Sequence, residues 1–184
     1  PIKDPPFGLY VAGVDPYRHS TSATSDSLGA IYIYKRMHDI ASEKYQDMFV
    51  AAYVARPKTK EEWQENARNL IKFYNARTLC ENDEMGFIEY MKAKGDEKYL
   101  ERQPSWVKEL FGSTVTREYG VHRSSPRIRN HLHSCFKQYM EEIIHKETDP
   151  ESGSIIKEVK GVNRVLDPML LEEVSKWNDD DNFD

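Results

Sequence analysis

The stretch Leu9-Tyr-Val-Ala-Gly-Val-Asp-Pro16 combines a short apolar run with a carboxylate and a proline. An apolar run of this length is typical of a β-strand that is buried on both faces, and Asp-Pro is a common strand end. The pattern therefore predicts a strand over residues 9–14 with Asp15 at its carboxyl end.

Three more strands are predicted from β-branched and aromatic runs, over Gly29–Lys35, Met48–Ala55 and Arg77–Cys80. The segment 17–27 is rich in Ser, Thr and Asp and predicts a loop, so we expect the first two strands to form a hairpin. The fourth strand ends at Glu81-Asn-Asp83, which places a second carboxylate at a strand end.

A helix is predicted between the third and fourth strands. Thr59 and Glu62 have the spacing of a capping box, and apolar residues follow at helical intervals: Trp63, Ala67, Leu70, Ile71 and Tyr74. Trp63, Trp106 and Trp177 are interpreted as packing residues. A second helix is predicted over about 84–94, with Gly95 in the C′ position.

The carboxyl-terminal half predicts further elements, although residues 96–113 follow no clear pattern. Ser124-Ser-Pro126 is a typical helix start, and an apolar stripe continues from there to Ile143. A turn is predicted over 149–153, a hairpin from 155–159 and 162–166 around Gly161, and a last helix after Asp167-Pro168.

The predicted order is three strands, a helix, a fourth strand and further helices. This order indicates a mixed sheet, first antiparallel and then parallel, with helices on its faces, which is the order of the ribonuclease H-like α/β fold. In that fold Asp15 and Glu81 would lie close together. Hard divalent ions such as Mg²⁺ and Mn²⁺ prefer oxygen ligands, and a pair of them about 4 Å apart can hydrolyse a phosphodiester. A third acid is expected near the chain end, where Asp179, Asp180, Asp181 and Asp184 are available.

Composition supports a folded chain and argues against several other classes. The 184 residues are 39% hydrophobic, 31% charged and 11% aromatic, which is too aromatic for a disordered protein. The sequence contains neither an apolar run of about 20 residues nor a signal-peptide pattern, so we expect a protein that is neither membrane-inserted nor secreted. Cys80 and Cys135 have no metal-binding spacing, and a reducing compartment is expected.

The charge distribution is uneven. The net charge is −5, but four acids lie in the last six residues, and the rest of the chain carries only −1. Residues 117–137 carry a net +4. This segment could contact a phosphate backbone, with Arg123, Arg127 and Arg129 as the candidate residues, or it could be a solvated helix face. His122, His131 and His133 are interpreted as ordinary surface groups.

The chain resembles the C-terminal nuclease domain of the large terminase subunit of tailed bacteriophages, over nearly its whole length. Five segments carry this resemblance in order: Tyr10-Val-Ala-Gly-Val-Asp-Pro16 with Ser25-Asp-Ser-Leu-Gly-Ala-Ile31, Leu79-Cys-Glu-Asn-Asp83 with Gly86, Tyr119-Gly-Val-His122, Pro168-Met-Leu-Leu-Glu-Glu-Val174, and Asn182-Phe-Asp184.

The resemblance implies a metal-dependent endonuclease that cuts concatemeric viral DNA during genome packaging, in the cytoplasm of the host cell. Its cofactors would be two Mg²⁺ or Mn²⁺ ions, and its partners double-stranded DNA, the portal and the small terminase subunit. An ATPase domain would normally precede this domain. The sequence has no GxxxxGK[ST] motif, so the chain would be only the nuclease half, with residues 1–8 as a linker or tail and residues 9–184 as the ribonuclease H-like nuclease domain.

The site residues implied by the resemblance are Asp15, Glu81 and Asp184, with Asp181 as the alternative third acid. Asp26 could reach the metals through water, or it could be only a turn residue. Two other functions remain open from the sequence. One is a resolvase-like nuclease with the same acids, and the other is a non-catalytic binding module with the same fold.

Overall fold

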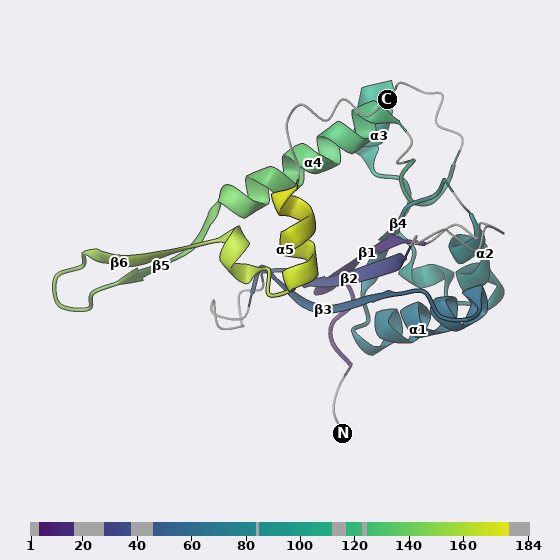
Figure 1. Ribbon diagram of the computed structural model, residues 1–184, viewed down its shortest axis with the longest axis horizontal. Helices are drawn as coiled ribbons and strands as arrows, with labels where there is room; N and C mark the ends of the chain where they lie inside the picture. The colour runs from purple at the N-terminus through teal and green to yellow at the C-terminus, as the bar shows by residue number, and fades with distance from the viewer. Residues whose placement is uncertain are drawn as a thin grey trace.

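The protein has a mixed four-stranded β-sheet flanked by helices (Figure 1). The computed structural model describes residues 4–16, 28–37, 46–83, 85–111, 117–122 and 125–176. The strands are β1 (Tyr10–Asp15), β2 (Gly29–Lys35), β3 (Met48–Ala55) and β4 (Arg77–Cys80), in the spatial order β3-β2-β1-β4. The four strands predicted from the sequence are confirmed.

Strand direction brings the ends of β1 and β4 together. β1 pairs antiparallel with β2, and β2 pairs antiparallel with β3. β1 and β4 run parallel, with Val14 opposite Cys80. Because parallel neighbours end at the same edge of a sheet, the residues that follow Val14 and Cys80 lie side by side.

One face of the sheet forms the main core. Alternate strand residues such as Ala12, Val14, Ile31 and Ile33 are buried on this face. They pack against α1 (Lys60–Phe73) and α2 (Gly86–Ala93), which contribute Trp63 and Phe87. The predicted helix signals are confirmed, since the Thr59 side chain accepts a hydrogen bond from the Glu62 N–H and Gly95 adopts a positive φ of 73° after α2.

The opposite face of the sheet is covered less completely. The helix α4 (Pro126–Glu141) crosses it, and the Phe136 ring lies edge-on to Phe49 with ring centroids 6.2 Å apart. α3 (Ser105–Phe111) packs against α4 through Val107, and α5 (Pro168–Ser175) contributes Leu170 to the pocket on this side. Gly13 is exposed, so the expectation that β1 is buried on both faces is wrong.

The predicted hairpin around Gly161 is also wrong. β6 (Ile155–Lys160) pairs instead with β5 (Ile143–Thr148), and Gly161–Arg164 forms a 3-10 turn, η4. The predicted turn at 149–153 joins the two strands, because the Asp149 carboxylate accepts hydrogen bonds from the backbone N–H groups of Glu151 and Ser152. α4 ends at Glu141, so Ile143 belongs to a strand and not to the helical stripe.

The β5–β6 hairpin projects from the body as an arm (Figure 1). At the other end of the chain, residues 5–8 contact the body: the Asn75 side chain donates a hydrogen bond to the Pro5 carbonyl. Among the described residues, no helix is both long enough and apolar enough to cross a membrane.

Candidate active site

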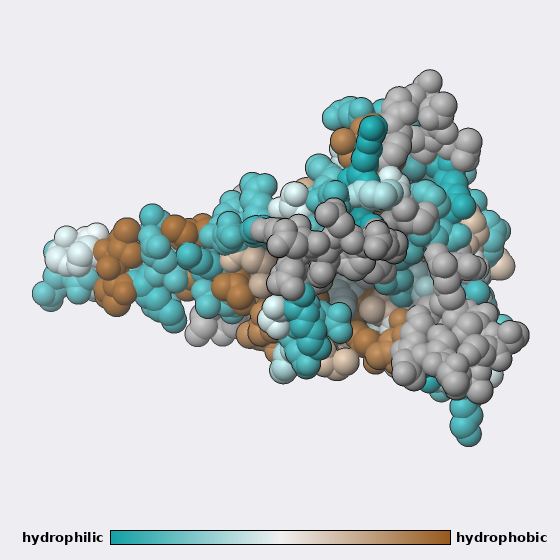
Figure 2. Space-filling view, turned by 45° about the horizontal axis from the view of Figure 1, so that its top comes forward, coloured by the Kyte–Doolittle hydropathy of each residue, from teal (hydrophilic) through white to brown (hydrophobic). Residues whose placement is uncertain are grey.

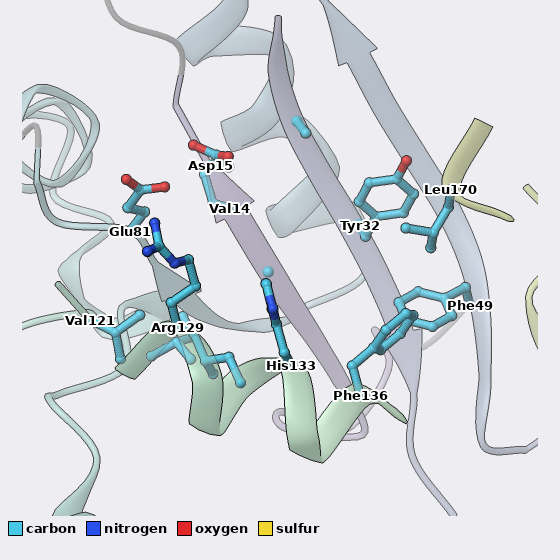
Figure 3. A pocket seen from close by; sticks show the side chains of 14 residues that line it. Val14, Asp15, Tyr32, Phe49, Glu81, Val121, Arg129, His133, Phe136 and Leu170 are labelled. Carbon is cyan, nitrogen blue, oxygen red and sulfur yellow. The ribbon is translucent and has the colours of Figure 1, made fainter. Parts of the chain in front are cut away.

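Asp15 and Glu81 lie next to each other at one end of a pocket (Figure 3). Asp15 is the last residue of β1, and Glu81 directly follows β4. The Glu81 N–H donates a hydrogen bond to the Val14 carbonyl, with an N···O distance of 2.8 Å, so it continues the parallel pairing. Two residues 66 positions apart in sequence thus present carboxylates from neighbouring strands.

The backbone around Glu81 is fixed from its other side by residues 119–121. The Val121 N–H donates to the Cys80 carbonyl at 2.9 Å, and the Asn82 N–H donates to the Val121 carbonyl at 2.8 Å. Glu81 and Val121 therefore form an isolated parallel bridge. Glu81 is held between two backbone segments, which limits its movement relative to Asp15.

Asn82 adds a side-chain clamp to this bridge. Its side chain is completely buried, and its amide nitrogen donates to the Tyr119 carbonyl at 2.6 Å. Its amide oxygen accepts a hydrogen bond of 3.3 Å from Arg117. A buried amide with both ends paired is stable only in one orientation, so Asn82 fixes the backbone immediately after Glu81.

Gly120 is required for the same close approach. Its φ is +75°, and a Cβ at this position would lie 2.3 Å from the Cys80 carbonyl oxygen. Only glycine combines this backbone conformation with that contact. The Tyr-Gly-Val-His segment noted in the sequence is therefore the support of β4.

The pocket lies between the open face of the sheet and α4, and its volume is about 440 Å³. Arg129 and His133 of α4 line it near the acids, and the guanidinium of Arg129 points toward Glu81 in Figure 3. A guanidinium in this position can neutralise part of the carboxylate charge or bind a phosphate oxygen.

The other end of the pocket is apolar. Tyr32 and Phe49 from the sheet, Phe136 from α4 and Leu170 from α5 line it (Figure 3). Burial, together with the nearby carboxylate of Asp167, the N-cap residue of α5, raises the pKa of Tyr32 to about 12. Tyr32 is thus neutral at physiological pH and connects the pocket wall to α5.

A second polar pair lies close to this edge of the sheet. The Nδ1 atom of His122 contacts the carboxylate of Asp83, whose side chain is only 6% exposed. These residues directly follow Val121 and Asn82, which pair around Glu81. The contact therefore joins the same two segments, 82–83 and 119–122, that the Asn82 side chain connects.

The structure separates the residues that the sequence proposed for the site. Asp15, Glu81 and Arg129 come together in the pocket, whereas Arg127 is exposed on α4 and does not line it. Asp26, Arg123, Asp181 and Asp184 lie outside the described residues, as does Trp177. Within the described residues, no three His, Cys, Asp or Glu side chains are grouped to hold a metal ion.

The part that α4 plays in the pocket differs from the prediction. His133, predicted to be a surface group, is half-buried and lines the pocket together with Leu132 and Phe136. The signal was present in the spacing, because residues 129, 132, 133 and 136 fall at i, i+3, i+4 and i+7 and so share one helix face. That face carries Arg129 and His133 near the acids and Phe136 at the apolar end of the pocket.

No protein-family model, curated protein or solved structure matches the chain.

Proposed function

We propose that this protein is a metal-dependent DNA endonuclease of the ribonuclease H-like class, which cuts concatemeric viral DNA during genome packaging. The observation that carries the proposal is the pair of carboxylates, Asp15 and Glu81, at the ends of the adjacent parallel strands β1 and β4. The resemblance to terminase nuclease domains suggests the biological setting: a host cytoplasm, with an ATPase domain, a portal and a small terminase subunit as partners.

The strand order supports the fold part of this proposal. Three antiparallel strands followed by a parallel fourth, in the order β3-β2-β1-β4, match the arrangement expected for the ribonuclease H-like class. Beyond β4, isolated parallel bridges from Thr78 to Leu100 and from Glu81 to Val121 extend the sheet by short segments. The adjacent strand ends that carry Asp15 and Glu81 support the proposal that these acids form the catalytic pair.

The two carboxylates fit a divalent metal by their chemistry. Asp15 and Glu81 offer adjacent hard oxygen donors, the ligand type that Mg²⁺ and Mn²⁺ prefer. Asp184 or Asp181 would supply the third acid. The bound ions would provide Lewis-acid activation of a phosphodiester and its attacking water.

The chain's own residues would orient the DNA strand. Arg129 can donate two parallel hydrogen bonds to the phosphate, and it lies on the pocket side opposite the sheet. His133, one helical turn further along α4, can donate a further hydrogen bond. The β-bridge between Glu81 and Val121 would keep Glu81 in place while the DNA strand binds.

A cleavage assay tests the proposal. We expect the protein to nick or cut plasmid DNA in Mn²⁺ or Mg²⁺ and to be inactive in excess EDTA. Asp15→Asn and Glu81→Gln should each lower the rate at least 100-fold, since loss of a metal ligand removes about 3 kcal/mol or more of transition-state stabilisation. Glu89→Gln, on the exposed side of α2, is the matched control and should cut normally.

A thermal melt shows whether these variants keep their fold. At 100 times its Kd, a metal ion adds about 2.7 kcal/mol of stability, which corresponds to a rise in Tm of about 5 to 11 °C. Wild type and Glu89→Gln should show this rise, whereas Asp15→Asn should lose it. Cleavage that persists in EDTA would refute the metal mechanism, and preference for four-way junctions over linear DNA would indicate a resolvase instead.

A further inference from the structure

Gly13 leaves the floor of the pocket open. It lies in the middle of β1, opposite Tyr32 of β2 and Leu79 of β4, and it is exposed although its strand is central in the sheet. A Cβ at Gly13 would meet no heavy atom of the described residues within 4 Å. Glycine weakens the interior of a strand, and it often marks a place where a ligand approaches the backbone.

The space above Gly13 has aromatic walls. Tyr32 flanks it on the sheet, Phe49 lies beyond Tyr32, and Phe136 faces them from α4 (Figure 3). Flat aromatic faces bind nucleobases by stacking, which contributes about 1–3 kcal/mol per base and tolerates any base. The rings of Tyr32, Phe49 and Phe136, which line one pocket with the open floor at Gly13, favour a planar ligand over an alkyl group.

The charged end of the pocket lies next to this opening. Asp15 is two residues beyond Gly13 on the same strand face, and Arg129 and His133 lie on the opposite wall. A nucleotide has two corresponding parts, because its flat base is joined through the sugar to a charged phosphate. The pocket thus places a site for a base beside a site for the phosphate that would be cut.

We infer that the pocket takes one unstacked nucleobase of the DNA strand, with the base over Gly13 and the adjoining phosphate toward Arg129. This inference rests on the proposed nuclease function for the identity of the polymer. It adds the substrate class: DNA in which a base can leave the stack, either single-stranded or locally melted. A base inside an intact duplex must be unpaired first, at a cost of a few kcal/mol.

Titration with a nucleoside tests the base site without any need for metal, phosphate or cleavage. In heteronuclear NMR spectra of the isotope-labelled chain, thymidine should shift the backbone amide signals of Gly13, Ala30 and Tyr32. Deoxyribose, which lacks the base, should bind about 5- to 140-fold more weakly, the range that corresponds to the stacking contribution.

Gly13→Val fills the floor and should abolish these shifts. Its Tm should stay at or above that of wild type, because valine favours a strand and its Cβ enters open space. Ala52→Val is the matched control, because it also introduces a valine into the sheet. Ala52 of β3 pairs with Tyr32 of β2, but it does not line the pocket. This variant should bind thymidine as wild type does.

Three results would overturn the inference: equal affinity for thymidine and deoxyribose, thymidine shifts that persist in Gly13→Val, or shifts at Gly13 caused by leucine amide but not by thymidine. The last would identify a peptide site. Asp15→Asn should lose cleavage and keep thymidine binding. A chain that binds thymidine but cuts no DNA contradicts only the proposed nuclease, and one that cuts DNA but ignores thymidine contradicts only the base site.

Discussion

Asn82 shows how a residue that carries no chemistry can determine the geometry of one that does. It is fully buried one position after Glu81, and its side-chain amide joins Tyr119 and Arg117 across the edge of the sheet. Leaving a buried polar group of this kind unpaired costs free energy of folding, so the hydrogen bonds hold both Asn82 and its partners in place. The position of Glu81 relative to Asp15 therefore depends on contacts from outside the pocket.

Replacing Asn82 with alanine should lower both stability and activity. The Tyr119 carbonyl would lose its partner inside the protein, which costs about 1–3 kcal/mol of unfolding free energy, or a fall in Tm of about 2 to 12 °C. Cleavage at a temperature where the variant is folded should also fall, because Glu81 is no longer held. Thermal melts and initial rates of plasmid nicking measure the two effects.

Asn66→Ala is the control for this substitution. Asn66 also donates a side-chain hydrogen bond, to the Tyr53 hydroxyl, but it is exposed on α1. Water can replace that bond, so the change in stability should be about 0.5 kcal/mol or less. If Asn82→Ala were as stable and as active as Asn66→Ala, the clamp would have no role at Glu81.

At the scale of elements, α4 divides the basic residues of its first turn between two tasks. Arg129 lines the pocket, whereas Arg127 is exposed. Residues two positions apart on a helix point in different directions, so these two arginines cannot serve the same contact. The positive segment identified in the sequence is therefore partly site and partly surface.

Single substitutions should separate the two arginines. Arg127→Ala should weaken DNA binding and lower the slope of log affinity against log salt by about 0.9, the value for one lost phosphate contact. Arg129→Ala should lower the cleavage rate at saturating DNA more than it lowers affinity. α4 should remain folded in both, because alanine favours helix and Ile128 and Phe136 still pack.

Lys98→Ala serves as the charge-matched control. Lys98 lies over the ring of Tyr99, which belongs to the main core on the other side of the sheet. The variant loses the same charge and should leave the salt slope unchanged. If the salt slope of Arg127→Ala is also unaltered, Arg127 makes no phosphate contact and belongs to a solvated helix face.

The elements differ in how far the sequence could predict them. β1 to β4 and the start of each long helix were predictable, because alternation, caps and prolines are local signals. The pairing of β6 with β5 was not predictable. Ile143 continues the apolar spacing of α4, and only the end of that helix at Glu141 shows that Ile143 belongs to a strand. Pairing depends on tertiary context, which periodicity does not contain.

The site divides in the same way. Asp15 and Glu81 were predictable as a pair, since strand order alone brings their strand ends together. The open floor at Gly13 and the clamp at Asn82 were not, because each depends on which side chains of distant segments fill the neighbouring space. A glycine in a strand and a buried amide become meaningful only with those neighbours present.

For the whole molecule, the sheet separates a stabilising layer from a functional one. One face packs on α1 and α2 and buries the largest side chains, including Trp63 and Phe87. The other face carries the pocket and, through α4 and η4, the root of the β5–β6 arm. Figure 2 shows apolar side chains along this arm, where Ile155 and Ile156 are 52% and 65% exposed.

The arm should be dispensable for stability. No residue of β5 or β6 is buried, and an isolated two-stranded hairpin is at best marginally stable. His145 and Val159 face each other, so residues 146–158 can be replaced by Asn-Gly, the sequence of a two-residue hairpin turn. We expect the shortened protein to melt within about 4 °C of wild type, equivalent to about 1 kcal/mol, and to cut DNA, because the pocket residues lie elsewhere.

The root of the arm should behave in the opposite way. A Cβ at Gly161 would lie 1.9 Å from the Tyr139 carbonyl oxygen of α4, so Gly161→Ala must displace backbone that the body depends on. The Tm of Gly161→Ala should fall well below that of the shortened protein. This is expected although Gly161→Ala adds only one carbon atom, whereas the deletion removes most of a hairpin. Differential scanning calorimetry of both variants measures the contrast. A larger loss of Tm in the deletion than in Gly161→Ala would mean that the arm packs against the body and contributes to its stability.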